Sequence, residues 1–249
     1  MKPLVEWFQG RDLGSLGAGE LGEYLGSFAD GVTRNDHRKR AVALWRWAQN
    51  NRRIPRGVQL EIELTERAKE NATEIGILNA ETWAKLLHWC HEKKPEYLAA
   101  LVLAGFCGLR ADEIHGKRAD RGVRQSWADV HLDRGFVRVT VAKTNTPAWR
   151  MVPLCPAAIA WLRLCPGQRA GPVCEPAALE KLRWHAKRAA FALPENCLRH
   201  SFISHRIPVT KGNKPQVASE AGNSVAEIDK RYRVPLTLSE GRAWFAVTP

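Results

Sequence analysis

Three short stretches near the C-terminus decide the fold of this chain: NCLRHSF at residues 196–202, AGNS at 221–224 and DKRYR at 229–233. The last stretch carries Tyr232, one of only three tyrosines, among three cations. Positive charge favours both a phenolate and a bound phosphate, so this tyrosine suits nucleophilic attack on a phosphodiester. A ring packed on a basic amphipathic helix explains the same residues. Tyr232 therefore needs distant partners before it indicates chemistry.

The charge balance of the chain predicts a polyanionic partner. Its 249 residues, 45% hydrophobic and 26% charged, fit one or two soluble globular domains. The 38 Lys and Arg residues exceed the 26 Asp and Glu residues, which gives a formal net charge of +12. Nucleic acid is the simplest such partner, and a membrane surface is the competing one. We find no uncharged apolar run of about 18 residues and no secretory signal, so we expect no membrane span and a cytoplasmic, nucleoid-associated protein.

The six cysteines form no CxxC pair and show no zinc or disulfide spacing. The stretch HWCH at 88–91 places two histidines one helical turn apart, but no second pair of ligands is evident. A helix surface explains this stretch better than a metal site. We therefore predict reduced thiols and no metal site.

The N-terminal part combines a glycine-rich start with a basic helix. Residues 1–33 contain so many glycines that we expect short helical turns at best. A firmer helix, over 36–53, can be capped by Asn35 or Asp36. Its charges are nearly all positive, which is typical of a phosphate-contacting surface and equally of a solvated face. The candidate DNA-binding residues are Arg38, Lys39, Arg40, Arg52 and Arg53.

Two further expectations concern this part. Trp45 and Trp47 cannot share one helix face, so at least one of them is expected to be partly exposed. Residues 57–64 have the composition of a linker. We therefore place a domain boundary within 55–75 and divide the chain into a short, partial helical segment with its linker, 1–70, and a larger domain, 71–249.

From Asn79 the pattern becomes regular. A helix that begins there carries an apolar side, which consists of Trp83, Leu86, Leu87 and Cys90. Residues 97–106 are apolar on most sides and predict a central buried helix, with Pro95 at its start. Gly108 permits a break after it, so Arg110 and Glu113 are expected one turn apart on the next helix.

A small antiparallel sheet is expected next. Residues 126–132 and 136–141 alternate between apolar and polar, and 149–154 returns as a third strand. Lys143 lies near the tip of the hairpin between the second and third strands. Helices are expected at 157–164 and 177–191, and the rest of the chain reads as helical. The fold class is therefore α+β, mainly helical, with three antiparallel strands.

Five motifs in series resemble the catalytic domain of the tyrosine recombinase (phage integrase) family over roughly residues 75–240. They are Gly108-Leu109-Arg110 with Glu113-Ile114, Lys143-Thr144 before Arg150-Met151-Val152-Pro153-Leu154, Leu198-Arg199-His200-Ser201-Phe202, Gly222-Asn223-Ser224, and Tyr232. Each motif alone is a weak signal. Their common order and spacing make the resemblance strong.

The resemblance implies a mechanism for double-stranded DNA. Tyr232 would attack the scissile phosphate, giving a 3′-phosphotyrosyl link and a free 5′-hydroxyl, and reversal would religate the strand without metal or nucleotide cofactor. Arg110 and Arg199 would clamp the non-bridging oxygens. Lys143 would protonate the leaving 5′-oxygen. Glu113 would orient neighbouring groups.

Two positions depart from the family pattern. Asn196 stands where the family usually has His, three residues before the second arginine, and Asn223 stands where it usually has His or Trp. An amide can donate a hydrogen bond to phosphate, so Asn223 can keep part of its role. Asn196 cannot exchange a proton near neutral pH, so it cannot be the general base. The family often has His directly after this arginine, so we expect a structural role for His200, and His205 is a candidate substitute base.

The N-terminal part also departs from the family, because only the helix over 36–53 and its tail resemble a piece of the usual core-binding domain. Family members assemble as tetramers on two DNA duplexes, and we expect a free monomer and a homotetramer on synapsed DNA. Two functions remain open at this point. One is site-specific DNA recombination in a mobile element. The other is a recombinase-derived DNA-binding protein whose cleavage is lost or strongly reduced.

Overall fold

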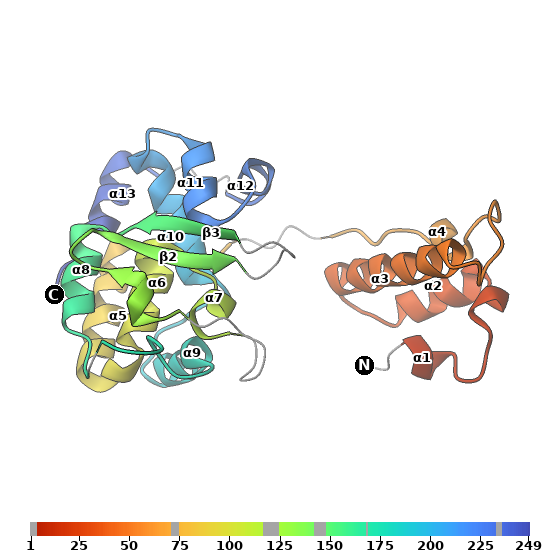
Figure 1. Cartoon of the computed structure of the whole chain (residues 1–249), viewed down its shortest axis with the longest axis horizontal. Helices are drawn as coiled ribbons and strands as arrows, with labels where there is room; N and C mark the ends of the chain where they lie inside the picture. The colour runs from red at the N-terminus through yellow and green to blue at the C-terminus, as the bar shows by residue number, and fades with distance from the viewer. Residues whose placement is uncertain (1–3, 71–74, 117–124, 142–147, 168, 233–235) are drawn as a thin grey trace. The chain divides into compact units, whose positions relative to one another are not determined.

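The computed structural model of the chain describes all residues except 1–3, 71–74, 117–124, 142–147, 168 and 233–235. The chain divides into two compact units, Met1–Glu74 and Ile75–Pro249 (Figure 1), here called the N-terminal unit and the C-terminal unit. Within the described residues, no helix is both long and apolar enough to cross a membrane.

The N-terminal unit is helical and has its own core. Its elements are α1 (Leu4–Trp7), η1 (Leu13–Ser15), α2 (Ala18–Gly26), α3 (Gly31–Asn50) and α4 (Glu61–Leu64). Phe8, Leu21 and Tyr24 from the glycine-rich start share this core with Trp45 of α3 and Ile62 of α4. The expectation of short turns before residue 33 was therefore wrong, since α2 is a nine-residue helix. Burial of its apolar face outweighs the low helix propensity of glycine.

Two other expectations for this unit need correction. The helix α3 begins at Gly31, and its cap is Asp30, whose carboxylate accepts hydrogen bonds from Val32 N at 3.4 Å and Thr33 N at 2.8 Å. Residues 57–64 are not a linker, because Leu60 and Ile62 are buried in the core. The expectation for the two tryptophans is confirmed, since Trp45 is buried and Trp47 is 57% exposed.

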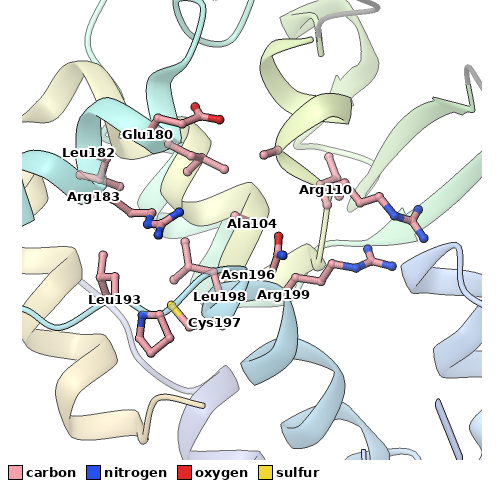
Figure 2. A pocket seen from close by; sticks show the side chains of 14 residues that line it. Ala104, Arg110, Glu180, Leu182, Arg183, Leu193, Asn196, Cys197, Leu198 and Arg199 are labelled. Atoms are coloured by element: carbon pink, nitrogen blue, oxygen red, sulfur yellow. The ribbon is translucent and has the colours of Figure 1, made fainter. Parts of the chain in front are cut away.

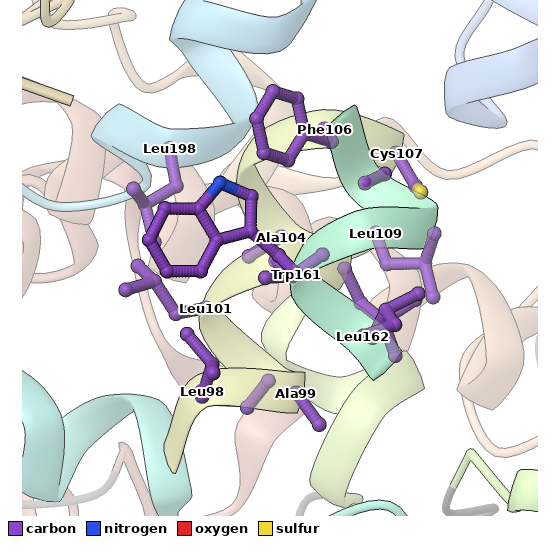
Figure 3. Close-up of a cluster of buried hydrophobic side chains, with 14 of the residues drawn as sticks. Leu98, Ala99, Leu101, Ala104, Phe106, Cys107, Leu109, Trp161, Leu162 and Leu198 are labelled. Atoms are coloured by element: carbon purple, nitrogen blue, oxygen red, sulfur yellow. The ribbon is translucent and has the colours of Figure 1, made fainter. Parts of the chain in front are cut away.

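The C-terminal unit is built around one buried helix. Asn79 caps α5 (Ala80–Lys93), as expected, and η2 (Pro95–Tyr97) leads into α6 (Leu98–Cys107). Every residue of α6 is buried. Figure 3 shows the α6 side chains around Trp161, which comes from a helix later in the chain. The apolar run thus forms the core on which the other elements are placed.

The sheet has the predicted antiparallel order, with a shorter first strand. It contains β1 (Val130–His131), β2 (Phe136–Val141) and β3 (Ala148–Pro153), with β2 in the centre. Residues Trp127–Asp129, expected as strand, form the 3-10 helix η3. In β2 and β3, Val137 pairs with Val152 and both are buried, so the alternation places one face of the hairpin on the core.

The remaining helices complete the unit. They are α7 (Ala111–His115), α8 (Pro156–Arg163), α9 (Ala178–Arg188), α10 (Cys197–Val209), α11 (Lys214–Ala221), α12 (Val225–Arg231) and α13 (Leu238–Phe245). Helix α10 packs on α6, α11 and α13, and α11 also contacts β3. The mainly helical α+β fold with a three-stranded sheet is therefore confirmed.

Candidate functional site

Arg110 is positioned by the break between α6 and α7. Gly108 ends α6 with a left-handed φ of 65°, and a Cβ atom there would lie 2.2 Å from Cδ1 of Phe202. Only glycine tolerates both the dihedral angle and this close approach. Two residues later, Arg110 is the N-cap of α7, and its backbone N–H donates to Glu113 Oε2 at 2.8 Å. Arg110 and Glu113 thus lie one turn apart at the start of α7, as predicted.

Glu113 joins two guanidinium groups. Its Oε1 accepts from Arg110 Nη1 at 3.1 Å and from Arg150 Nη1 at 2.9 Å, and its Oε2 accepts from Arg150 Nη2 at 2.8 Å. Burial pushes the pKa of Glu113 up, but the hydrogen bonds and charges of Arg150 and Arg110 outweigh it, so its pKa is lowered. The carboxylate therefore stays ionised and orients both arginines.

Sequence reasoning treated Arg150 only as part of a strand. Its guanidinium is nearly buried, and its Nε also donates to the carbonyl oxygen of Glu220 at 3.0 Å. A signal was present, because Arg150 alternates in register with the buried Val152 and Leu154. A charged residue on the inward face of a strand indicates a buried ionic partner.

Arg199 and Asn223 connect α10 to the residues after α11. Arg199 is 8% exposed, its Nη1 donates to the carbonyl oxygen of Gly108, and its Nη2 donates to Asn223 Oδ1 at 2.8 Å. Arg110 Nη2 donates to the same Oδ1 at 2.8 Å and to the carbonyl oxygen of Gly222 at 2.6 Å. Guanidinium groups only donate, so the amide oxygen must face them and the amide NH₂ remains on the other side.

The two arginines therefore form one cationic centre. Burial, and then the charge of Arg110, lower the pKa of Arg199 to about 10, so both groups are charged at neutral pH. Figure 2 shows the side chains of Arg110 and Arg199 extending toward the same side. Two adjacent guanidinium groups with an amide between them can bind a tetrahedral anion through several charge-assisted hydrogen bonds.

Tyr232 lies directly after α12 and contacts a histidine. Its hydroxyl is 2.8 Å from Nδ1 of His200, and the two ring centroids are 5.5 Å apart. Burial raises the pKa of Tyr232, against the opposing charges of Arg199 and Arg231. The cations near this tyrosine therefore do not outweigh its burial, contrary to the expectation from its charged neighbours in sequence. In the free protein Tyr232 is a neutral phenol.

The other histidine proposed as a base lies elsewhere. His205 is 3% exposed, its Nε2 is 2.9 Å from the carbonyl oxygen of Leu78, and its ring stacks on Trp244 with centroids 4.6 Å apart. This imidazole is thus engaged in the core. The structure brings His200, and not His205, to the tyrosine.

Asn196 lies at the start of α10, beside both arginines. It adopts a left-handed φ of 57°, a conformation that asparagine tolerates better than most residues. Its side chain lines a cavity of about 70 Å³ together with Arg110 and Arg199 (Figure 2). Arg183 and Glu180 of α9 line the same cavity. The position that the resemblance assigned to a base is therefore near the cationic centre, but carries an amide.

Lys143 lies outside the described residues, so its position is not part of this geometry. The strands on either side of it pair as far as Val141 and Ala148. Strand β2 therefore ends at the predicted residue, and β3 begins one residue earlier than predicted.

The basic residues of the N-terminal unit divide into two kinds. Lys39, Arg40, Arg52 and Arg53 are exposed, and Arg40 pairs with Asp36. Arg38 is half-buried and donates to the backbone carbonyl oxygens of Glu63 and Thr65, both at 3.0 Å. Arg38 thus holds the C-terminal end of α4 on α3, and its contact with phosphate stays a prediction.

No protein-family model and no curated protein matches this sequence. Solved structures share its fold. The integrase of transposon Tn1549, bound to circular intermediate DNA, has a TM-score of 0.63 at 14% identity, covering 95% of this chain and 88% of that one. A lambda integrase dimer on a COC′ core site has a TM-score of 0.64 at 15% sequence identity, covering 90% of this chain and 82% of that one. XerA recombinase has a TM-score of 0.50 at 16% sequence identity, covering 94% of this chain and 84% of that one. The chain therefore has the tyrosine recombinase fold that its motifs imply.

Proposed function

We propose that this protein cleaves and rejoins double-stranded DNA at specific sites by transesterification, with Tyr232 as the nucleophile. The observation that carries the proposal is the convergence of Arg110 and Arg199 on Asn223, with the hydroxyl of Tyr232 in contact with His200, the residue after Arg199. A phosphodiester bound between the guanidinium groups would lie within reach of a phenol held next to them. These are the groups that such a reaction requires.

Each residue has a role in the proposed reaction. Arg110 and Arg199 hold the non-bridging oxygens and stabilise the charge of the pentacoordinate transition state. The amide NH₂ of Asn223 donates a further hydrogen bond to the phosphate. Lys143 protonates the leaving 5′-oxygen. Tyr232 forms the 3′-phosphotyrosyl bond, and attack by a 5′-hydroxyl on that bond restores the strand, so the number of phosphodiester bonds is conserved.

The likeness in fold to DNA-bound integrases supports an assembly on DNA. Solved structures of lambda integrase contain a dimer on a COC′ core site and a tetramer on a Holliday junction. By analogy, we propose a tetramer on synapsed duplexes and a monomer in the absence of DNA, with the exposed cations Lys39, Arg40, Arg52 and Arg53 contacting phosphates. Integration or excision of a mobile element is the corresponding biological role.

A second function is favoured by a specific observation. Asn196 stands at the cationic centre where an ionisable side chain would assist proton transfer. General acid–base assistance is worth about 10²–10⁴ in rate. A chain without it would bind DNA through the same cations but cleave slowly or not at all. The second candidate is therefore a DNA-binding protein derived from a recombinase.

Covalent capture separates the two functions. Because the target sequence is unknown, the full chain is incubated with a pool of nicked suicide duplexes whose central base pairs are randomised. Adducts are resolved on denaturing gels and their DNA is sequenced. The recombinase function predicts a protein–DNA adduct that disappears in Tyr232→Phe. The matched controls, Tyr24→Phe and Tyr97→Phe, remove the other two tyrosines and should retain it.

Two results would contradict the proposal. DNA binding by the wild type without adduct, for any sequence in the pool, would establish the binding function. An adduct that persists in Tyr232→Phe would mean that another residue is the nucleophile.

A further inference from the structure

The contact between His200 and Tyr232 is a hydrogen bond between two groups that are neutral in the free protein. Burial, and then the charges of Arg199 and Arg231, lower the pKa of His200, while burial raises the pKa of Tyr232. Both shifts favour the neutral form, so at neutral pH a phenol faces a neutral imidazole at 2.8 Å. A neutral imidazole has one donor and one acceptor nitrogen, and a neutral phenol can donate or accept, so two tautomers fit this contact. In one of them Nδ1 accepts the phenolic proton and Nε2 carries the hydrogen.

We propose that His200 is the general base of strand cleavage, taking the phenolic proton of Tyr232 on Nδ1 as the phenolic oxygen attacks the phosphate. This inference rests on the proposed function of Tyr232. The O–H bond of Tyr232 breaks and an N–H bond forms on His200. The new O–P bond forms as the bond from phosphorus to the 5′-oxygen breaks, and the 5′-oxygen takes its proton from Lys143. In religation, the protonated His200 returns the proton to the leaving phenolate, which makes it the general acid of the reverse step.

The timing of proton transfer follows from the opposed pKa shifts. In the free protein the proton stays on the phenolic oxygen, because the phenol is a weaker acid than the protonated imidazole. As the oxygen becomes part of a phosphate ester, its proton becomes strongly acidic and passes to the adjacent nitrogen. The charges that face this pair are those of Arg199 on α10, Arg231 and Glu227 on α12, and Arg110 before α7. A bound phosphate adds negative charge beside the three cations and so favours protonation of His200.

The position of His200 also resolves the question raised by Asn196. The side chain of Asn196 has no titratable group, and His205 is engaged with Leu78 and Trp244 in the core. His200 follows Arg199 directly on α10, so the guanidinium that binds phosphate and the imidazole that contacts the nucleophile are held by one helical turn. The base and the clamp thus move together.

Single-turnover cleavage of the suicide substrate selected above tests the role of His200. For the wild type, we expect the rate to fall as the pH drops through the pKa that His200 has in the DNA complex. His200→Gln keeps a side chain of similar size without a titratable nitrogen, and should cleave about 10²–10⁴-fold more slowly at neutral pH. The rate of His200→Gln should not show the fall that protonation of His200 causes in the wild type. It should instead rise at high pH, where Tyr232 ionises to the phenolate. Added imidazole should increase the rate of His200→Ala, but not that of Tyr232→Phe.

Asn196→His is the second arm of the test. In the His200→Gln background it should restore part of the lost rate, since His tolerates the left-handed φ of this position and lies by the same cationic centre.

The outcomes distinguish the two proposals. Absence of adduct with the wild type overturns the proposed function, and the proton transfer with it. An adduct with an unchanged rate and pH profile in His200→Gln overturns only the role of His200. Nitrogen NMR of the free protein reads the tautomer without any cleavage. A hydrogen on Nε2 of His200 is expected, and a hydrogen on Nδ1 would overturn the assignment. Thermal unfolding and DNA affinity of His200→Gln should match the wild type, which excludes misfolding.

Discussion

Glu113 on α7 and Arg150 on β3 form an ion pair through two hydrogen bonds, 2.9 Å from Nη1 to Oε1 and 2.8 Å from Nη2 to Oε2. Both side chains are about nine-tenths buried, at 9% exposure for Arg150 and 11% for Glu113. Because Glu113 also holds Arg110, this pair connects the sheet to one of the two arginines of the proposed site. Its loss should affect stability and activity together.

Removing one partner of this pair should be more harmful than removing both. Arg150→Met and Glu113→Gln are each expected to lower the free energy of unfolding by about 3–5 kcal/mol, because a buried charge loses its partner. The double variant should recover part of that loss. Chemical unfolding of the full chain measures the three variants. A loss in the double variant equal to the sum of the two single losses would show that the two side chains do not stabilise each other.

The pair should also make stability depend on pH at the acid end. The pKa of Glu113 is lowered in the folded chain, since Arg150 and Arg110 outweigh the effect of burial. A carboxyl group with a lowered pKa stabilises the fold above its unfolded pKa of about 4.3, and loses that contribution as the pH falls through its folded pKa. We therefore expect the stability difference between wild type and Glu113→Gln to shrink below about pH 4. A difference that stays constant down to pH 2 would contradict this.

Asn223→Asp changes the charge at the proposed phosphate site and keeps the shape of the side chain. The carboxylate keeps an oxygen acceptor for Arg110 and Arg199, so the fold should be as stable as in the wild type. It also removes the amide NH₂ and adds a negative charge where the phosphate binds. Cleavage should fall about 10²–10³-fold, as for loss of one donor to a developing negative charge. Single-turnover adduct formation is the measurement, and wild-type rates would show that the amide NH₂ does not contact phosphate.

Gly108 should be the glycine least tolerant of substitution in this region. Gly108→Ala places a methyl group against the ring of Phe202 at a φ of 65°, two residues before Arg110. Gly135→Ala is a matched control, because Gly135 has a φ of 71° and no atom within 4 Å of the added methyl group. The control should lose about 1–2 kcal/mol from the left-handed dihedral alone. Gly108→Ala should lose about 1–3 kcal/mol more through overpacking, and its cleavage rate should fall as Arg110 shifts.

Two adjacent residues of α3 should respond differently to alanine. Lys39 is exposed, so Lys39→Ala should leave stability unchanged and lower the slope of log affinity against log salt by about 0.9 if it contacts one phosphate. Arg38 donates to backbone carbonyl oxygens at the C-terminal end of α4, so Arg38→Ala should lower the thermal stability of the N-terminal unit. DNA titrations at several salt concentrations and thermal unfolding measure both. An unchanged salt slope in Lys39→Ala would mean that Lys39 on α3 contacts solvent and not DNA.

Local patterns in the sequence determined much of the C-terminal unit. The Asn79 cap, the apolar run that forms α6, the break at Gly108 and the alternation of β2 and β3 each depend on neighbouring residues. Helical and strand periodicities report such features directly. The N-terminal start was misjudged for the same reason, since α2 is stabilised by contacts with α3 and α4 that no local pattern records.

The chain order of the motifs also determined which residues to examine, but the tertiary structure decided their partners. Arg110 meets Asn223 across 113 positions of sequence, and Tyr232 meets His200 across 32. Such contacts depend on how helices pack, which spacing along the chain does not specify. The direction of the Tyr232 pKa shift was likewise decided by burial, which outweighs the neighbouring cations. The sequence by itself singled out Tyr232 as the proposed nucleophile, and only packing identified the imidazole that contacts it.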